Sequence, residues 1–152
     1  MKKKDWGNAV WFLFHTLAEK IKDEHASTEL AVIVTHVISI CNNLPCPDCQ
    51  QHATQKMNMT NKAAIITSKD TFIHFLWQFH NEVNKRTKAP FYPKESLELY
   101  KRAKTGEVIR SFISIMGGTS NNSKTMLNGF HRQLYLKKFV DYIKANLHKY
   151  NP

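Results

Sequence analysis

The sequence predicts an all-α protein, and three observations support this fold class. Apolar residues recur every three or four positions through almost every long segment, which is the spacing of one face of a helix. Residues that cap or interrupt helices separate these segments. The 152 residues, 42% of them hydrophobic, are enough for one domain with its own core.

The first two helices lie in the first 41 residues. Asp5 is the expected N-cap of the first helix, which extends to Ile21. The apolar run from Glu29 to Cys41 is rich in β-branched residues, so its composition alone allows a strand. Its length, and Ser27 and Thr28 as caps, favour a second helix. The stripe of the first helix comprises Val10, Trp11, Phe14, Leu17, Ala18 and Ile21.

Three further helices are expected before residue 105, and one after it. Their ranges are Cys46 to about Met57, Ser68 to about Arg86, Lys94 to Lys104, and Phe130 to Leu147. Pro47 suits the first turn of the third helix, and residues 117–123 form an expected loop. The prediction is therefore a bundle of four or five helices with a basic, helical C-terminal extension.

Charge is unevenly distributed along the chain, whose formal net charge is +10. Residues 1–100 contain 12 basic and 10 acidic side chains, a net of +2, whereas residues 101–152 contain 10 and 2, a net of +8. Such a basic segment is usually a solvated face and less often a docking surface for an acidic partner.

The composition also excludes some classes of protein. No stretch approaches the length of a membrane span, and residues 6–21 are too polar for a signal-peptide core. Three cysteines do not make a secreted disulfide scaffold. We therefore expect an intracellular protein without a membrane partner.

Cys46-Pro47-Asp48-Cys49 is the motif with the clearest chemistry. A helix N-terminus stabilises a thiolate, and two cysteines three positions apart can close an exchangeable disulfide. Redox chemistry is the leading interpretation. A zinc site is the alternative, because His52 and one further histidine would complete four ligands. Cys41 is expected to be a small buried hydrophobe rather than a resolving thiol.

A second set of residues pairs an aromatic ring with a histidine on two helices. Trp11 and His15 are i, i+4 neighbours behind Gly7, and Trp77 lies one turn before His80. Taken singly, each is most simply a core residue. Together they suit a flat ligand with polar edges, such as a nucleotide or flavin.

Three motifs in order make the sequence resemble the Erv/ALR family of FAD-linked sulfhydryl oxidases, most closely the short versions encoded by large DNA viruses. They are Gly7-x-x-x-Trp11-x-x-x-His15, Cys46-Pro47-Asp48-Cys49 and His80-Asn81-Glu82-Val83-Asn84. The resemblance covers about residues 5–103. We therefore expect an FAD-binding domain at residues 1–103 and an extension of unknown role at residues 104–152.

The resemblance implies a helical bundle that holds FAD, usually in a homodimer. Cys46 would exchange with the thiols of a protein dithiol substrate, and Cys49 would lie against the flavin. Electrons would pass through FAD to O2 and give hydrogen peroxide. The residues implied to line the FAD are Gly7, Trp11, His15, His80, Asn81, Val83, Asn84, Lys85 and, as a looser match near the adenine, Tyr100.

The same resemblance suggests a viral thioredoxin-like protein as substrate, and the host cytoplasm, at the viral replication site, and the virion as locations. The chain departs from the family pattern in three ways. It lacks a second structural cysteine pair and a shuttle cysteine in the tail, and the expected phosphate-contacting lysine falls on Ala89, with Lys88 one position early. The competing function is a zinc-stabilised helical module that binds nucleic acid through the basic C-terminal segment. For the oxidase, nucleic acid is not an expected partner, although the basic segment leaves it open.

Overall fold

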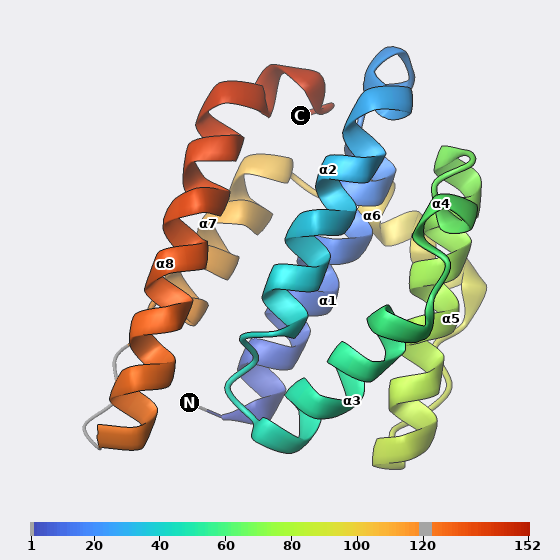
Figure 1. Cartoon of the computed structure of the whole chain (residues 1–152). Helices are drawn as coiled ribbons and strands as arrows, with labels where there is room; N and C mark the ends of the chain where they lie inside the picture. Colours follow the sequence, from blue (N-terminus) through green and yellow to red (C-terminus); the bar gives the residue numbers. More distant parts are fainter. Residues whose placement is uncertain (1, 119–122) are drawn as a thin grey trace.

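Helix α1 (Lys3–Lys20) lies at the centre of the molecule and packs most extensively against α7 and α5 (Figure 1). The computed structural model describes residues 2–118 and 123–152, and the side chains of residues 123–128 are left out of the description. The other helices are α2 (Asp23–Cys41), α3 (Pro47–Met59), α4 (Lys62–Ile65), α5 (Lys69–Thr87), α6 (Glu98–Arg102) after a 3-10 turn at Lys94–Leu97, α7 (Thr105–Met116), and α8 (Ser123–Asn146) before a 3-10 turn at Leu147–Lys149. The all-α prediction is confirmed.

The predicted starts of the third and fourth helices are also confirmed. Cys46 is the N-cap of α3, with Pro47 in the first turn. Ser68 is the N-cap of α5, where its hydroxyl accepts a hydrogen bond from the backbone N–H of Thr71 at 3.0 Å. Both helices begin where a local cap satisfies a backbone N–H that has no partner inside the helix.

Three other predicted boundaries are wrong. Helix α1 begins at Lys3, so Asp5 lies in its first turn instead of capping it. Helix α2 begins at Asp23, because two carboxylates suit its first turn, and the expected caps Ser27 and Thr28 lie inside it. Helix α8 begins at Ser123, seven residues before the expected start. Of the loop expected at residues 117–123, positions 119–122 lie outside the described residues.

The C-terminal segment forms part of the core of the protein. Helix α7, which the prediction left unassigned, buries Ile109, Phe112 and Met116 against α1. The rings of Phe112 and Phe139, from α7 and α8, meet edge to face with centroids 5.6 Å apart. These residues belong to the same core cluster as the first helices, so residues 105–152 cover a face of α1 and α2 rather than extending into solvent.

Backbone hydrogen bonds fasten the last residues to the junction of α1 and α2. The N–H of Lys22 donates to the carbonyl oxygen of Lys149 at 2.9 Å, and the N–H of Asn151 donates to that of Lys20 at 2.7 Å. Nearby, the buried carboxylate of Glu29 accepts a hydrogen bond from the Tyr142 hydroxyl at 3.0 Å. The last turn is therefore held by specific contacts as well as by apolar burial.

Among the described residues, no helix combines the length and the apolar character that crossing a membrane requires.

Candidate functional site

The two cysteines of the Cys-Pro-Asp-Cys motif lie together at the start of α3. The Cys49 thiol donates a hydrogen bond to the Cys46 sulfur, with the two sulfur atoms 2.7 Å apart, and the Cys49 backbone N–H donates to the same sulfur at 3.3 Å. Both cysteines are free thiols in this structure. The first helical turn thus holds the pair in position to form an intramolecular disulfide.

The two thiols differ in exposure and acidity. Cys46 is half-buried, and burial raises its pKa, but the hydrogen bonds from Cys49 and the charge of Lys3 outweigh burial and lower it overall. Cys49 is only 7% exposed, and burial, followed by its hydrogen bond to Cys46, raises its pKa. Cys46 is therefore the sulfur that solvent reaches and the one more readily ionised.

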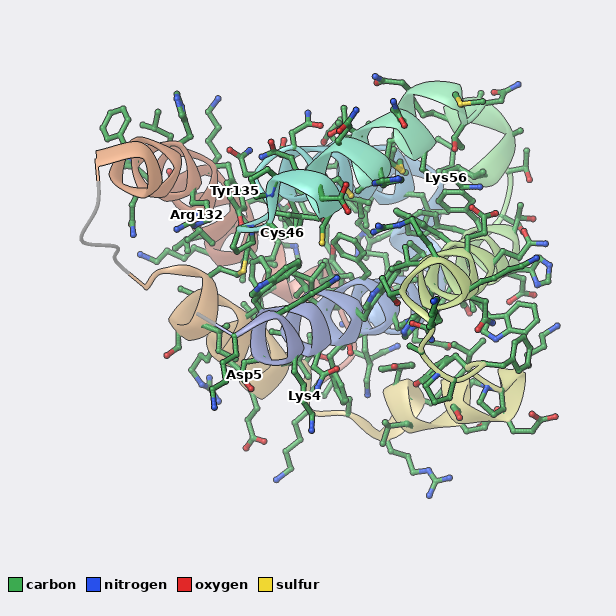
Figure 2. The ribbon with its side chains drawn as sticks, turned by 90° about the horizontal axis from the view of Figure 1, so that it is seen from below. Lys4, Asp5, Cys46, Lys56, Arg132 and Tyr135 are labelled. Carbon is green, nitrogen blue, oxygen red and sulfur yellow. The ribbon has the colours of Figure 1, made fainter. Side chains whose placement is uncertain are left out.

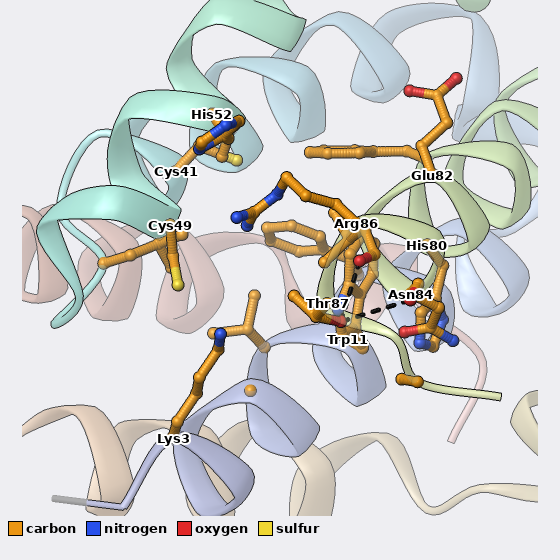
Figure 3. A pocket seen from close by; sticks show the side chains of 18 of the residues that line it. Lys3, Trp11, Cys41, Cys49, His52, His80, Glu82, Asn84, Arg86 and Thr87 are labelled. Atoms are coloured by element: carbon orange, nitrogen blue, oxygen red, sulfur yellow. Dashed lines mark hydrogen bonds between the residues drawn. The ribbon is translucent and has the colours of Figure 1, made fainter.

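A cavity of about 370 Å³ lies beside Cys49, between α1, α3 and α5 (Figure 3). Apolar side chains form much of its wall, including Trp11, Phe14 and Phe79. Gly7 also lines it, and a Cβ built at Gly7 meets no heavy atom within 4 Å. Of the residues expected to bind FAD or exchange disulfides, the cavity wall contains Gly7, Trp11, Cys49, His80, Val83 and Asn84. Cys41, His52 and Ala89 line it as well.

His15 and His80 form a buried pair at the back of this wall. The Nε2 atom of His15 and the Nδ1 atom of His80 are 2.9 Å apart, so one ring donates and the other accepts. Burial lowers the pKa of His80 to about 4, and burial together with the nearby His80 lowers that of His15 to about 3. Both rings are neutral near pH 7, which suits a low-dielectric wall.

Stacked rings fix the orientation of the pair. The indole of Trp11 lies parallel to the imidazole of His80, with centroids 4.3 Å apart. The ring of His15, in turn, stacks on the ring of Tyr100, with centroids 4.7 Å apart. His15 and Tyr100 are therefore close to the site but outside the lining of the cavity.

Asn81 and Lys85 line a neighbouring cavity of about 580 Å³, and Asn84 lines both cavities. The Asn81 amide holds Tyr92: its Nδ2 donates to the Tyr92 carbonyl oxygen at 3.1 Å, and its Oδ1 accepts from the Tyr92 N–H at 2.7 Å. Trp77 donates to the same carbonyl oxygen at 2.8 Å. Trp77 also lies on the wall of this second cavity and does not line the first, whose wall contains His80.

Charged residues that the sequence analysis did not single out surround the first cavity. Two ion pairs join α3 to α5: Arg86 with Asp48 at 3.2 Å, and Lys56 with Glu82 at 2.8 Å. The partners are separated by 38 and 26 residues in the sequence, so no local pattern could have identified them. Lys3 also lines this cavity. In the sequence, the only signal for a lysine at this site is the run of basic residues at positions 2–4.

The zinc interpretation gains no support from the described residues, among which no group of three or more His, Cys, Asp or Glu side chains could hold a metal ion. The Nδ1 atom of His52 is instead 2.9 Å from the backbone oxygen of Asp48, within its own helix. The arrangement around Cys49 is that of a thiol pair beside an apolar, cation-rimmed pocket, with the neutral imidazole of His80 on its wall and that of His15 behind it.

Comparison with known proteins matches residues 8–104 to the Erv1 / Alr family. Among curated proteins, the chain is 32% identical over 87 residues to the putative FAD-linked sulfhydryl oxidase 096R of Invertebrate iridescent virus 3, covering 57% of this chain and 59% of that protein. It is 27% identical over 81 residues to the FAD-linked sulfhydryl oxidase of African swine fever virus (isolate Tick/Malawi/Lil 20-1/1983), covering 53% and 66%. It is 30% identical over 92 residues to the FAD-linked sulfhydryl oxidase ERV2 of Saccharomyces cerevisiae, covering 59% and 45%.

The matched region thus spans about three fifths of the iridescent virus protein. No solved structure matches the chain significantly. The family match contains the cysteine pair, Trp11 and the His80–Asn84 segment, and ends just before α7. Because residues 8–104 are well over half of the 152 residues, the chain belongs to the Erv1/Alr family.

Proposed function

We propose that this protein is an FAD-dependent sulfhydryl oxidase that forms disulfides in protein dithiols through the Cys46–Cys49 pair. One observation carries the proposal: a thiol pair at a helix N-terminus borders a pocket with flat aromatic and imidazole walls, with Cys46 toward solvent and Cys49 on the pocket wall. The names of the viral and yeast relatives support the same activity.

The residues of the pocket fit a flavin nucleotide. The pocket has an apolar lining, and the parallel rings of Trp11 and His80 provide flat surfaces of the kind that a planar ring system packs against. The absent Cβ of Gly7 leaves room for the close approach of a ligand. Lys56 and Arg86 line the same pocket and supply positive charge for a diphosphate.

We propose that Gly7, Trp11, His80, Val83 and Asn84 contact FAD, since all five line the pocket. Asn81 and Lys85 would contribute from the adjoining cavity. His15 and Tyr100 would contribute indirectly, by holding the His80 ring in its orientation, because His15 is hydrogen-bonded to His80 and stacked on Tyr100. Bound FAD supplies the chemistry that takes two electrons from a dithiol and delivers them to dioxygen as hydrogen peroxide.

The chain itself performs thiol–disulfide exchange. A substrate thiolate bonds to the Cys46 sulfur of the oxidised pair, the Cys46–Cys49 bond breaks, and its electron pair leaves on Cys49. The second substrate thiolate then attacks the substrate sulfur of the mixed disulfide and releases Cys46 as a thiolate. The substrate loses two electrons to the cysteine pair. The greater exposure of Cys46 supports its role as the attacked sulfur.

The partners and location of the protein follow from the same proposal. We propose a protein dithiol as substrate, a viral thioredoxin-like protein being one candidate, with O2 as electron acceptor and a homodimer as the assembly. The viral origin of two of the relatives supports a location in a host cell. We propose the host cytoplasm, at the viral replication site, and the virion.

The experiment is an absorbance spectrum of the purified protein, together with oxygen consumption on addition of dithiothreitol. We expect a yellow protein with flavin absorbance that consumes oxygen and releases hydrogen peroxide. Cys49→Ala should abolish turnover and retain FAD, because it removes one of the two exchanging sulfur atoms and leaves the rest of the pocket intact. A colourless protein that does not recover activity with added FAD would exclude the proposal.

A further inference from the structure

Cys49 is an unfavourable place for a negative charge. The thiol is buried at a pocket wall formed largely by apolar side chains, and burial raises its pKa. A thiol with a high pKa is a slow leaving group in disulfide exchange. Opening the Cys46–Cys49 disulfide by attack at Cys46 nevertheless places an electron pair on the Cys49 sulfur. A group that stabilises this charge would accelerate the step.

Several charged or titratable groups surround the pocket, contributed by α1, α3 and α5. Arg86 is paired with Asp48 and Lys56 with Glu82, so two of the cations are engaged with carboxylates. Lys3 and Lys4 have no carboxylate within 4.0 Å among the described residues. Besides the thiols of Cys41, Cys46 and Cys49, these groups are Lys3, Lys4, Asp48, His52, Lys56, His80, Glu82 and Arg86.

The side chain of Lys3 is directed at Cys49, one of the two thiols of the Cys46–Cys49 pair (Figure 3). In Figure 3 its side chain extends from the first residue of α1 toward Cys49, and both residues line the pocket. Its charge and hydrogen-bonding capacity act to lower the pKa of Cys49, against the larger effect of burial. Its charge also acts to lower the pKa of Cys46. Lys4 is one residue further along the helix, and the lysine whose charge acts most on both cysteines is Lys3.

The position of Lys3 is unfavourable for the helix itself. A cation in the first turn is repelled by the partial positive charge of a helix N-terminus, typically by about 0.3–1 kcal/mol. Lys3 is also exposed and makes no ion pair within the described part of the chain. Its placement is therefore poorly explained by a contribution to folding.

We propose that Lys3 stabilises the Cys49 thiolate released when a substrate thiolate opens the Cys46–Cys49 disulfide. This inference rests on the oxidase function proposed above. In the step, the new bond joins the substrate sulfur to Cys46, the bond to Cys49 breaks, and the departing electron pair stays on Cys49 beside the Lys3 ammonium. No proton transfer to Cys49 is needed at that moment.

The test measures thiolate reactivity residue by residue in the flavin-loaded protein. Wild type, Lys3→Gln, Lys3→Arg and Lys4→Gln are reduced under nitrogen and alkylated with iodoacetamide between pH 5 and 9, and mass spectrometry follows each cysteine separately. We expect Lys3→Gln to move the pH profiles of both cysteines to higher pH and to slow alkylation at pH 7 by a factor on the order of three to ten. Lys3→Arg should restore the profiles. Lys4→Gln, which removes the same charge from the next residue, should leave them as in wild type.

Two further measurements separate the outcomes. Repeating the Lys3→Gln comparison in a Cys46→Ser background reports on Cys49 without coupling to its partner, and the shift should persist. Thermal unfolding should show that Lys3→Gln is at least as stable as wild type. Unchanged profiles in Lys3→Gln, or an equal shift in Lys4→Gln, would overturn the proposal. If Lys3→Gln shows the shift but the wild-type protein oxidises no dithiol, the oxidase function alone would be refuted.

Discussion

Replacing Gly7 with alanine should stabilise the protein without flavin and weaken its binding of flavin. Gly7 lies inside α1, where glycine is less favourable than alanine by about 0.5–1 kcal/mol. A Cβ at this position meets no heavy atom within 4 Å, so the methyl group causes no clash in the protein itself. For a domain of this size, the gain corresponds to a rise in Tm of about 1–4 °C.

The same methyl group would project into the pocket. If FAD approaches the backbone at Gly7, the added carbon costs about 1–3 kcal/mol of binding free energy, as overpacking does in a protein core. The Kd for FAD should then increase about 5- to 150-fold. The stability of the flavin-free protein and its affinity for flavin would thus change in opposite directions.

Circular dichroism melts of the flavin-free protein and fluorescence titration with FAD measure the two effects. Gly106→Ala is the matched control, because Gly106 lies in α7 away from the pocket and its added Cβ would meet only the exposed side chain of Arg110, at 3.3 Å. We expect this control to bind FAD as wild type does. Unchanged FAD affinity in Gly7→Ala would refute close approach at this glycine, and a lower Tm would refute the open space that the structure shows beside it.

The remaining predictions concern the histidine pair, the core and the third cysteine. His15 and His80 have pKa values of about 3 and 4, below the unfolded value near 6.5, so the unfolded chain alone gains protons as the pH falls. The free energy of unfolding should therefore decrease from pH 6.5 to about pH 4, by at most about 1.4 kcal/mol per pH unit for each histidine; urea titrations showing constant stability across this range would contradict the neutral pair. Phe139→Ala should lower the free energy of unfolding by about 3–5 kcal/mol, because the ring is fully buried, whereas Phe130→Ala, at a residue 59% exposed, should have little effect. Equal effects in denaturant titrations would mean that α8 is not part of the core. Cys41→Ala should leave dithiothreitol oxidation unchanged, because burial raises the pKa of this thiol to about 12; a large loss of oxygen consumption would assign it a role in electron transfer.

Local signals account for the parts of the fold that were predicted correctly. Cys46, Pro47 and Ser68 mark helix starts through hydrogen bonds and backbone angles within a few residues. Boundaries were wrong where the local signal is ambiguous, as at Ser27 and Thr28, which helices tolerate in their interior when the surrounding residues pack. Helix α7 is absent from the prediction although Ile109, Phe112 and Met116 recur at helical spacing, so the sequence does contain a local signal for it.

Packing between helices decided the features that were not predicted. The Arg86–Asp48 pair and the direction of Lys3 depend on how α1, α3 and α5 are rotated about their axes. Figure 2 shows Arg132 and Tyr135 on α8 at one edge of the molecule, and both side chains are buried. The basic C-terminal segment, for which charge alone indicated a solvated face or, less often, a docking surface, buries apolar residues against α1 and α2.

By itself, the sequence determined the helical class, the cysteine pair at a helix N-terminus and the motifs of the family. Each depends on residue type and spacing over a few turns, where hydrogen bonding and apolar periodicity are local. Only the tertiary structure decided that Cys49 borders a pocket, that His15 and His80 share a hydrogen bond, and that α7 and α8 complete the core. Those outcomes depend on distances between residues far apart in the chain, which are set by the packing of all the helices together.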